Sequence, residues 1–158
     1  MSVVKQSILG WLLAEGIKTE TGVLLEVKDH AFMLEIYRDL SPKQVIMKAA
    51  QVTMSTCAIL KAFWVAKREK MDLIYLLPTD SDRNTFVGGK VNRMIAQNPE
   101  LLKLVKDKDS VEQKQVDDNF IHFRGSWSQK AAIMVPSDLN IYDEVDSSKQ
   151  SVIEMYSS

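Results

Sequence analysis

Cysteine and histidine are scarce in this sequence, and neither charge dominates. The single cysteine, Cys57, excludes an internal disulfide and a metal cluster made of cysteines alone, and it suits a reducing, intracellular compartment. The two histidines, His30 and His122, are too few and too far apart to indicate a zinc site without cysteine ligands. Lysine and arginine number 20 against 21 acidic residues, so any contact with a polyanion must be local.

Long hydrophobic runs are also missing. The apolar stretch 8–13 is followed by Glu15 and Lys18 and by no convincing cleavage site, so it predicts a core helix rather than a leader. No stretch approaches the ~20 apolar residues that a membrane-spanning helix requires. With 46% hydrophobic and 26% charged residues, the chain is expected to fold as one soluble domain.

The hydrophobic periodicity indicates alternating helices and strands. Helices are expected over residues 4–17, 31–40, 55–70, 81–97, 100–106 and 149–156, and strands over residues 22–27, 44–48, 72–77 and 139–142. Alternating runs within residues 110–124 predict an inserted β-hairpin that turns at Asp117 to Asn119. The β-α-β-α order from residue 44 predicts an α/β fold with a mostly parallel sheet and helices on both faces. Because no strand follows the last helix, we expect the domain to be incomplete.

The stretch KAAQVTMST, which begins at Lys48, has the layout of a phosphate-binding loop that opens a helix with Ser55 and Thr56. Backbone N–H groups at such a helix start face anionic phosphates, and a hydroxyl group reaches Mg²⁺. Glycine is lacking, since Lys48 and Thr53 take the two glycine places of the G-x-x-x-x-G-K-[ST] pattern and Met54 takes the lysine place. On this pattern alone an ordinary strand-to-helix turn is favoured. A positive φ at Thr53 would strain a β-branched residue.

Two adjacent carboxylates, Asp143 and Glu144, follow the predicted strand 139–142. Carboxylates at the C-terminal end of a parallel strand lie at the edge where open α/β sheets bind ligands. In nucleotide hydrolysis the first carboxylate of such a pair holds Mg²⁺, and the second orients and deprotonates the attacking water. An isolated Asp-Glu pair is most often part of a solvated loop. Here a functional role is better supported, because the loop that begins at Lys48 follows another predicted strand at the same edge of the sheet.

Together these residues resemble the N-terminal ATPase domain of the large terminase subunit of tailed bacteriophages, the motor that packages DNA into proheads. The similarity is most specific in KAAQVTMST and in IYDEVD, which begins at Ile141. Family loops are often of the form K-x-x-Q-x-G-x-S-T, and in some members the working lysine lies at the start of the loop, as Lys48 does. Residues 30–39 match the region where the family contacts adenine. Thr53 in place of the loop glycine and Ala50 in place of a frequent arginine depart from the family pattern.

The resemblance implies a P-loop NTPase fold of the RecA/ASCE-like type, with ATP and Mg²⁺ as ligands. The nucleotide-binding residues that it implies are Lys48, Gln51, Val52, Thr53, Met54, Ser55 and Thr56. It implies Ser55 (or the neighbouring threonine) and Asp143 as Mg²⁺ ligands, and Glu144 as the residue that activates water. Family motors are rings in which a neighbour supplies an arginine in trans, and Arg124 or Arg83 is the candidate for that role.

The resemblance therefore implies an ATP-hydrolysing motor domain, residues 1–158, that powers translocation of double-stranded DNA into the prohead. It also implies a homo-oligomeric ring on the prohead or a monomer in isolation, the portal protein and the small terminase subunit as partners, no membrane, and the host cytoplasm. The family's C-terminal nuclease domain is not recognised in the sequence. Two alternatives stay open: a catalytically inactive fragment that acts as an assembly or interaction module, and a helicase-like translocase domain.

Overall fold

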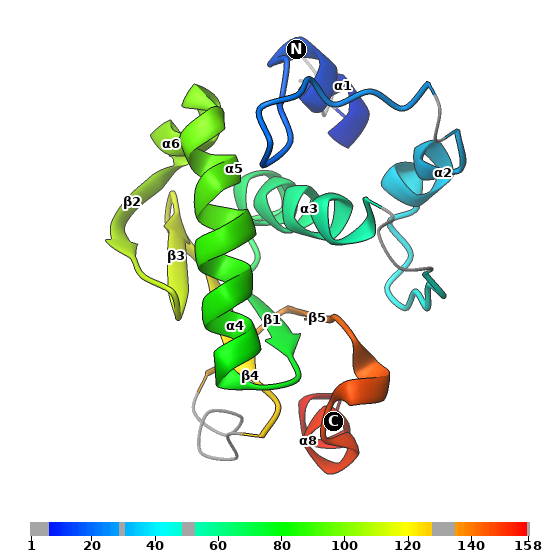
Figure 1. Ribbon diagram of the computed structural model, residues 1–158, viewed down its shortest axis with the longest axis vertical. Helices are drawn as coiled ribbons and strands as arrows, with labels where there is room; N and C mark the ends of the chain where they lie inside the picture. The colour runs from blue at the N-terminus through cyan, green and yellow to red at the C-terminus, as the bar shows by residue number, and fades with distance from the viewer. Residues whose placement is uncertain (1–6, 29–30, 49–52, 128–134, 158) are drawn as a thin grey trace.

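The computed structural model describes residues 7–28, 31–48, 53–127 and 135–157 (Figure 1). In chain order the elements are α1 (Ile8–Ala14), α2 (Phe32–Arg38), α3 (Met54–Arg68), β1 (Leu73–Leu77), α4 (Asp80–Phe86), the π-helical turn η1 (Val87–Val91), α5 (Asn92–Gln97), α6 (Pro99–Leu104), β2 (Val105–Asp109), β3 (Gln113–Val116), β4 (Asn119–Gly125), β5 (Leu139–Tyr142), the 3₁₀ turn η2 (Val145–Ser147) and α8 (Gln150–Ser157).

Within these ranges the strands form one sheet in the order β2-β3-β4-β1-β5. Strand β1 pairs in parallel with both β4 and β5, whereas β3 pairs antiparallel with β2 and β4. The predicted hairpin is confirmed, and it turns at Asp117, whose φ of 54° is a conformation that aspartate tolerates. The predicted α/β class is also confirmed. The sheet is mixed because the hairpin strands extend it in the antiparallel sense.

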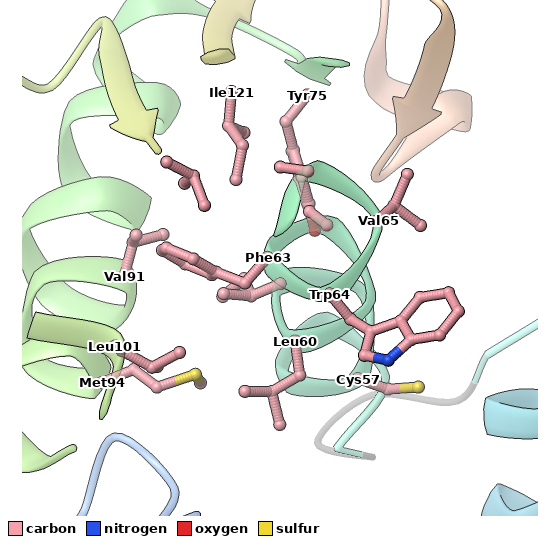
Figure 2. Close-up of a cluster of buried hydrophobic side chains, with 14 of the residues drawn as sticks. Cys57, Leu60, Phe63, Trp64, Val65, Tyr75, Val91, Met94, Leu101 and Ile121 are labelled. Carbon is pink, nitrogen blue, oxygen red and sulfur yellow. The ribbon is translucent and has the colours of Figure 1, made fainter. Parts of the chain in front are cut away.

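The hydrophobic core lies between the sheet, α3 and the long helix that α4, η1 and α5 form together. All five residues of β1 are buried, and Leu73, Tyr75 and Leu77 belong to the main core cluster. Figure 2 shows Phe63 pointing from α3 toward Val91 of the long helix. Both of these side chains are fully buried, and each contributes about 2 kcal/mol through removal of apolar surface from water. The core thereby fixes the carboxyl end of β1 relative to the start of α3.

The long helix begins with a capping box in which Thr79 and Asp82 satisfy each other's backbone N–H groups. It runs to Gln97 as predicted, but with the π-helical turn η1 in its middle. In Figure 1 it is the upright green helix in front of the sheet. The turn contains Gly88 and Gly89, which have no neighbouring atom within 4 Å of a Cβ added at either position.

Two predicted strands are wrong. Residues 22–27 make only a single bridge, between Lys18 and Leu24, and residues 44–48 have no strand pairing. The side chains of Val45 and Met47 are fully exposed. A strand exists only where its backbone finds a partner, and within the described chain these apolar runs do not join the sheet.

Candidate active site

Asp143 lies at the carboxyl end of β5, where its backbone N–H donates to the carbonyl of Leu76 at 3.0 Å and so continues the pairing with β1. Lys48 Nζ contacts Oδ1 of its carboxylate at 2.5 Å. On the other oxygen, Oδ2, Ser55 donates from Oγ at 3.0 Å and Tyr75 donates from its hydroxyl at 2.9 Å. The carboxylate therefore joins three parts of the chain: the stretch 48–55, β1 and the end of β5.

Lys48 contacts both of the groups predicted to hold a cation, because its ammonium also lies 3.4 Å from Ser55 Oγ. The Lys48 side chain is 30% exposed, against 11% for the side chain of Asp143. The lysine and the serine hydroxyl, which the sequence analysis selected from one loop, and the aspartate, which it selected from a distant strand end, thus lie within hydrogen-bonding distance of one another. A single nucleotide with its metal ion spans a larger distance than this.

The pKa of Asp143 is lowered by its contacts. Burial raises the pKa, but the hydrogen bonds from Lys48 and Tyr75, the charge of Lys48 and the hydrogen bond from Ser55 outweigh that effect. The carboxylate is consequently ionised at neutral pH, which is the form that binds a cation.

Asp143→Asn should lower the free energy of unfolding at neutral pH, and the difference from the wild type should shrink below about pH 4. Because the folded chain has the lower pKa, the charged form stabilises the fold above the unfolded pKa, and this stabilisation is lost as the pH falls through the folded pKa. Urea unfolding of both proteins at neutral and at acidic pH measures the difference. A difference that does not change with pH would contradict the lowered pKa.

Ser55, rather than Thr56, is the hydroxyl that meets Asp143. Thr56 is buried, and its Oγ1 donates to Glu20 Oε2 at 3.1 Å. Glu20 in turn pairs with Lys90 of the π-helical turn at 3.4 Å. Thr56 therefore ties the start of α3 to the N-terminal segment, and Ser55 is the better candidate for a metal ligand.

The strain expected at Thr53 is not present. Its φ is −65°, an ordinary value for a β-branched residue, and α3 begins at the next residue, Met54. The absent glycine therefore costs no backbone strain in this structure. Gln51 and Val52, which the resemblance also assigns to the loop, lie outside the described residues.

Glu144 has a left-handed backbone conformation, with φ 55° and ψ 51°. For a residue with a Cβ this conformation costs about 1–2 kcal/mol, so the surrounding structure must impose it. It turns the chain out of β5 directly after Asp143 and starts η2. The turn leaves the Glu144 side chain exposed beside Asp143.

Two cavities flank the start of α3. A cavity of about 270 Å³ is lined by Ser55, Leu77, Asp82, Thr85, Phe86, Lys90, Asp143 and Glu144. A second cavity, of about 210 Å³ and mainly apolar, is lined by Thr19, Val23, Leu24, Leu25, Glu26, Val27, Met33, Tyr37 and Thr53. Thr53 and Ser55 are two residues apart and line different cavities, so a polar site and an apolar site meet at this helix start.

The two candidate arginines make contacts at the hairpin instead. Arg124 donates to the backbone oxygens of Glu112 and Phe123 at 3.0 and 3.1 Å. Arg83 is buried and pairs with Asp80 at 3.1 Å and with the Glu112 carboxylate at 3.8 Å. Both guanidinium groups therefore lie against Glu112 rather than on the carboxylate at the end of β5.

The donor set fits Mg²⁺ bound together with a phosphate ligand. In the part of the chain that the structure describes, no cluster of three or more histidine, cysteine, aspartate or glutamate residues could hold a metal ion. One carboxylate and one hydroxyl, Asp143 and Ser55, are instead in contact. Mg²⁺ is usually bound by one or two carboxylates plus substrate phosphates, rather than by a cage made only of protein ligands.

Comparison with protein families gives a match over residues 30–155 to the model of the phage terminase large subunit gpA, ATPase domain. The chain belongs to this family. No curated protein and no solved structure matches it. The mixed sheet with its helices is compatible with part of a P-loop NTPase domain, and the family is one of ATPases in phage DNA packaging. Among the described residues, no helix of this terminase ATPase domain is long and apolar enough to cross a membrane.

In this terminase ATPase domain Tyr75 contacts the carboxylate of Asp143 and Glu20 contacts Thr56, and sequence reasoning missed both contacts. Tyr75 lies inside the apolar run LIYLL, where an aromatic residue is typical of a buried strand. The one signal was side-chain alternation: Tyr75 pairs with Ile141, and Asp143 lies two residues further along, on the same face. That signal becomes readable only when the pairing of β1 with β5 is known.

Proposed function

We propose that this terminase ATPase domain binds Mg-ATP at the ends of β1 and β5 and hydrolyses it to move double-stranded DNA into a prohead. The observation that carries the proposal is the direct contact of Lys48 and Ser55 with Asp143. These three residues come from the deviant phosphate loop and the acidic strand end, which are the two halves of a nucleotide site. Membership of the terminase ATPase family supports the same chemistry.

Lys48 has the role of neutralising the phosphates. Its long side chain reaches Asp143 from the opposite end of the loop to Ser55. This side chain is 30% exposed, so a phosphate can draw its ammonium away. The first backbone N–H groups of α3 lack partners within the helix and face the same anion. Lys48 thereby takes over the role of the lysine that directly precedes the hydroxyl pair in the usual loop.

Ser55 and Asp143 would hold Mg²⁺. When bound, Mg²⁺ supplies the charge that stabilises the negative oxygens of the phosphates during transfer. The lowered pKa of Asp143 keeps its carboxylate ionised for this contact. Both residues line the cavity of about 270 Å³, so they face the space that the phosphates would occupy.

Glu144 has the role of general base. Glu144 directly follows Asp143 in the sequence, and its side chain lines the same cavity. There it accepts a proton from water as the water oxygen forms a bond to the γ-phosphorus. The bond between that phosphorus and the bridging oxygen breaks, which releases ADP and phosphate.

The apolar cavity beside Thr53 suits the adenine base. Its lining includes Met33 and Tyr37 of α2, in the region that the family resemblance assigns to adenine contact. A flat apolar ring fits a pocket of this kind, since most ligand sites combine apolar walls with a few polar groups. In this arrangement, the start of α3 separates the base from the phosphates.

The assembled motor is proposed to be a homo-oligomeric ring that works on the prohead in the host cytoplasm. Its partners would be double-stranded DNA, the portal protein and the small terminase subunit, in line with the family. An arginine in trans, Arg124 or Arg83, would complete the site of the neighbouring subunit. Either arginine must first leave its contacts at Glu112.

Lys48→Met should weaken Mg-ATP binding about 10- to 100-fold, because it removes a charged hydrogen bond to phosphate. Equilibrium titration with a fluorescent ATP analogue in the presence of Mg²⁺ measures the effect. Lys43→Met is the matched control, since Lys43 is an exposed lysine on the same segment, and its affinity should equal that of the wild type. Equal affinities of all three proteins would contradict the role of Lys48. An absence of binding by the wild type would favour the inactive assembly module instead.

A further inference from the structure

The three side chains that donate hydrogen bonds to Asp143 have different roles in the proposed nucleotide site. In the described part of the chain, the side chains of Lys48, Ser55 and Tyr75 donate to its carboxylate. The proposed function, on which this inference rests, assigns Lys48 to the phosphates and Ser55 to Mg²⁺. Tyr75 has no role toward either ligand, so it is the donor that can keep its hydrogen bond to Asp143 while Mg²⁺ and the nucleotide bind.

The ring of Tyr75 is buried and packs against two other aromatic rings. Its residue exposure is 0%, and its ring centroid lies 5.1 Å from that of Phe86 and 5.6 Å from that of Phe123. Aromatic pairs at these separations add stability beyond the burial of their area. The hydroxyl therefore has a fixed position at the end of a rigid side chain.

The hydroxyl of Tyr75 is a donor to the carboxylate of Asp143. A protonated phenol donates to a carboxylate and does not compete with it for a cation. Its partner atom is Oδ2, whereas Lys48 contacts Oδ1.

We propose that Tyr75 is a positioning residue that anchors Oδ2 of Asp143 and so leaves Oδ1 directed at Mg²⁺ when Lys48 moves to the phosphates. The two carboxylate oxygens then have separate tasks. Partners that orient a metal ligand in this way typically change metal affinity or activity 10- to 100-fold when removed. A residue that only packs in the core would affect stability alone.

Tyr75→Phe tests this inference, because phenylalanine keeps the ring between Phe86 and Phe123 and removes only the hydroxyl. The measurement is the Mg²⁺ concentration that gives half-maximal binding of a non-hydrolysable ATP analogue. We expect it to rise about 10-fold, with little change in binding of the analogue in the presence of EDTA.

Ser126→Ala is the matched control. Ser126 is a fully buried hydroxyl at the same end of the sheet, but it donates to the carbonyl of Pro78 and accepts from the N–H of Lys149. We expect it to lower the melting temperature and to leave the Mg²⁺ half-saturation unchanged. Phe123→Leu keeps the hydroxyl of Tyr75 but loosens its ring, so a smaller rise in half-saturation is expected.

The outcomes separate this inference from the proposed function. If the wild type shows Mg²⁺-dependent binding and Tyr75→Phe has the same Mg²⁺ half-saturation, the positioning role is overturned and the nucleotide site stands. If Tyr75→Phe and Ser126→Ala raise the half-saturation equally, the effect is one of general stability, and the positioning role is again overturned. If the wild type shows no Mg²⁺-dependent binding, the proposed function fails and this inference fails with it.

Discussion

Glu144→Gln should reduce steady-state phosphate release roughly 1,000-fold, because glutamine cannot accept the proton of the attacking water. Glutamine has nearly the same size and still forms hydrogen bonds, and the left-handed turn that directs this side chain is a backbone feature. Binding of Mg-ATP should therefore remain within a few-fold of the wild type. Phosphate release under saturating Mg-ATP, together with equilibrium binding, separates the lost chemistry from lost affinity.

Asp146→Asn provides the control for the loss of one negative charge near the site. Asp146 is an exposed carboxylate in η2, two residues beyond Glu144. It should keep the phosphate release of the wild type, since it does not line the cavity that contains Asp143. Equal release from Glu144→Gln and the wild type would rule out Glu144 as the general base. It would indicate that the measured release comes from a contaminating enzyme or from a different residue.

Gly125→Ala should lower the free energy of unfolding by about 3 kcal/mol, because β4 ends directly against the start of α4. A Cβ at Gly125 would lie 2.4 Å from the backbone nitrogen of Asp80 and 2.5 Å from the carbonyl carbon of Thr79. These are backbone atoms, so no side-chain rotation relieves the overlap. For a chain of this size the melting temperature should fall by about 6–12 °C.

Gly88→Ala is the control for that substitution. Nothing lies within 4 Å of a Cβ added at Gly88, and this glycine is inside a helix. Alanine should leave stability unchanged or raise it by up to about 1 kcal/mol, since glycine is a poor helix former. Thermal and urea unfolding of both variants compare the two positions. If both substitutions have the same effect, the close approach of β4 to α4 does not limit stability.

Sequence patterns predicted the elements whose signals are local. Helix α3 has a continuous apolar face, β1 is an apolar run closed by Pro78, and the hairpin has its turn residues. Strand β2, of sequence VKDKD, was missed because it is mostly charged and owes its existence to pairing with β3. The strands predicted over residues 22–27 and 44–48 were wrong because an apolar run forms a strand only where a neighbouring strand is available for pairing.

The candidate site, like the fold, was predictable only in part. Lys48, Ser55 and Asp143 were selected through the resemblance to the terminase family, and the structure brings them into contact. Tyr75 could not be selected, since its hydroxyl reaches Asp143 only through the register of β1 against β5. The alternation of apolar and polar residues indicates register where one face of a strand is exposed, but β1 is buried at all five positions and has no such alternation.

The contact between Lys48 and Oδ1 of Asp143 has a consequence for how the two ligands of this site affect each other. The ammonium competes with a divalent cation for that oxygen, and the phosphates of the nucleotide compete with Asp143 for the ammonium. Each ligand therefore removes a competitor of the other, so ATP should raise the affinity for Mg²⁺, and Mg²⁺ should raise the affinity for ATP by the same factor. Under the proposed function, a single lysine would therefore make the binding of metal and nucleotide cooperative.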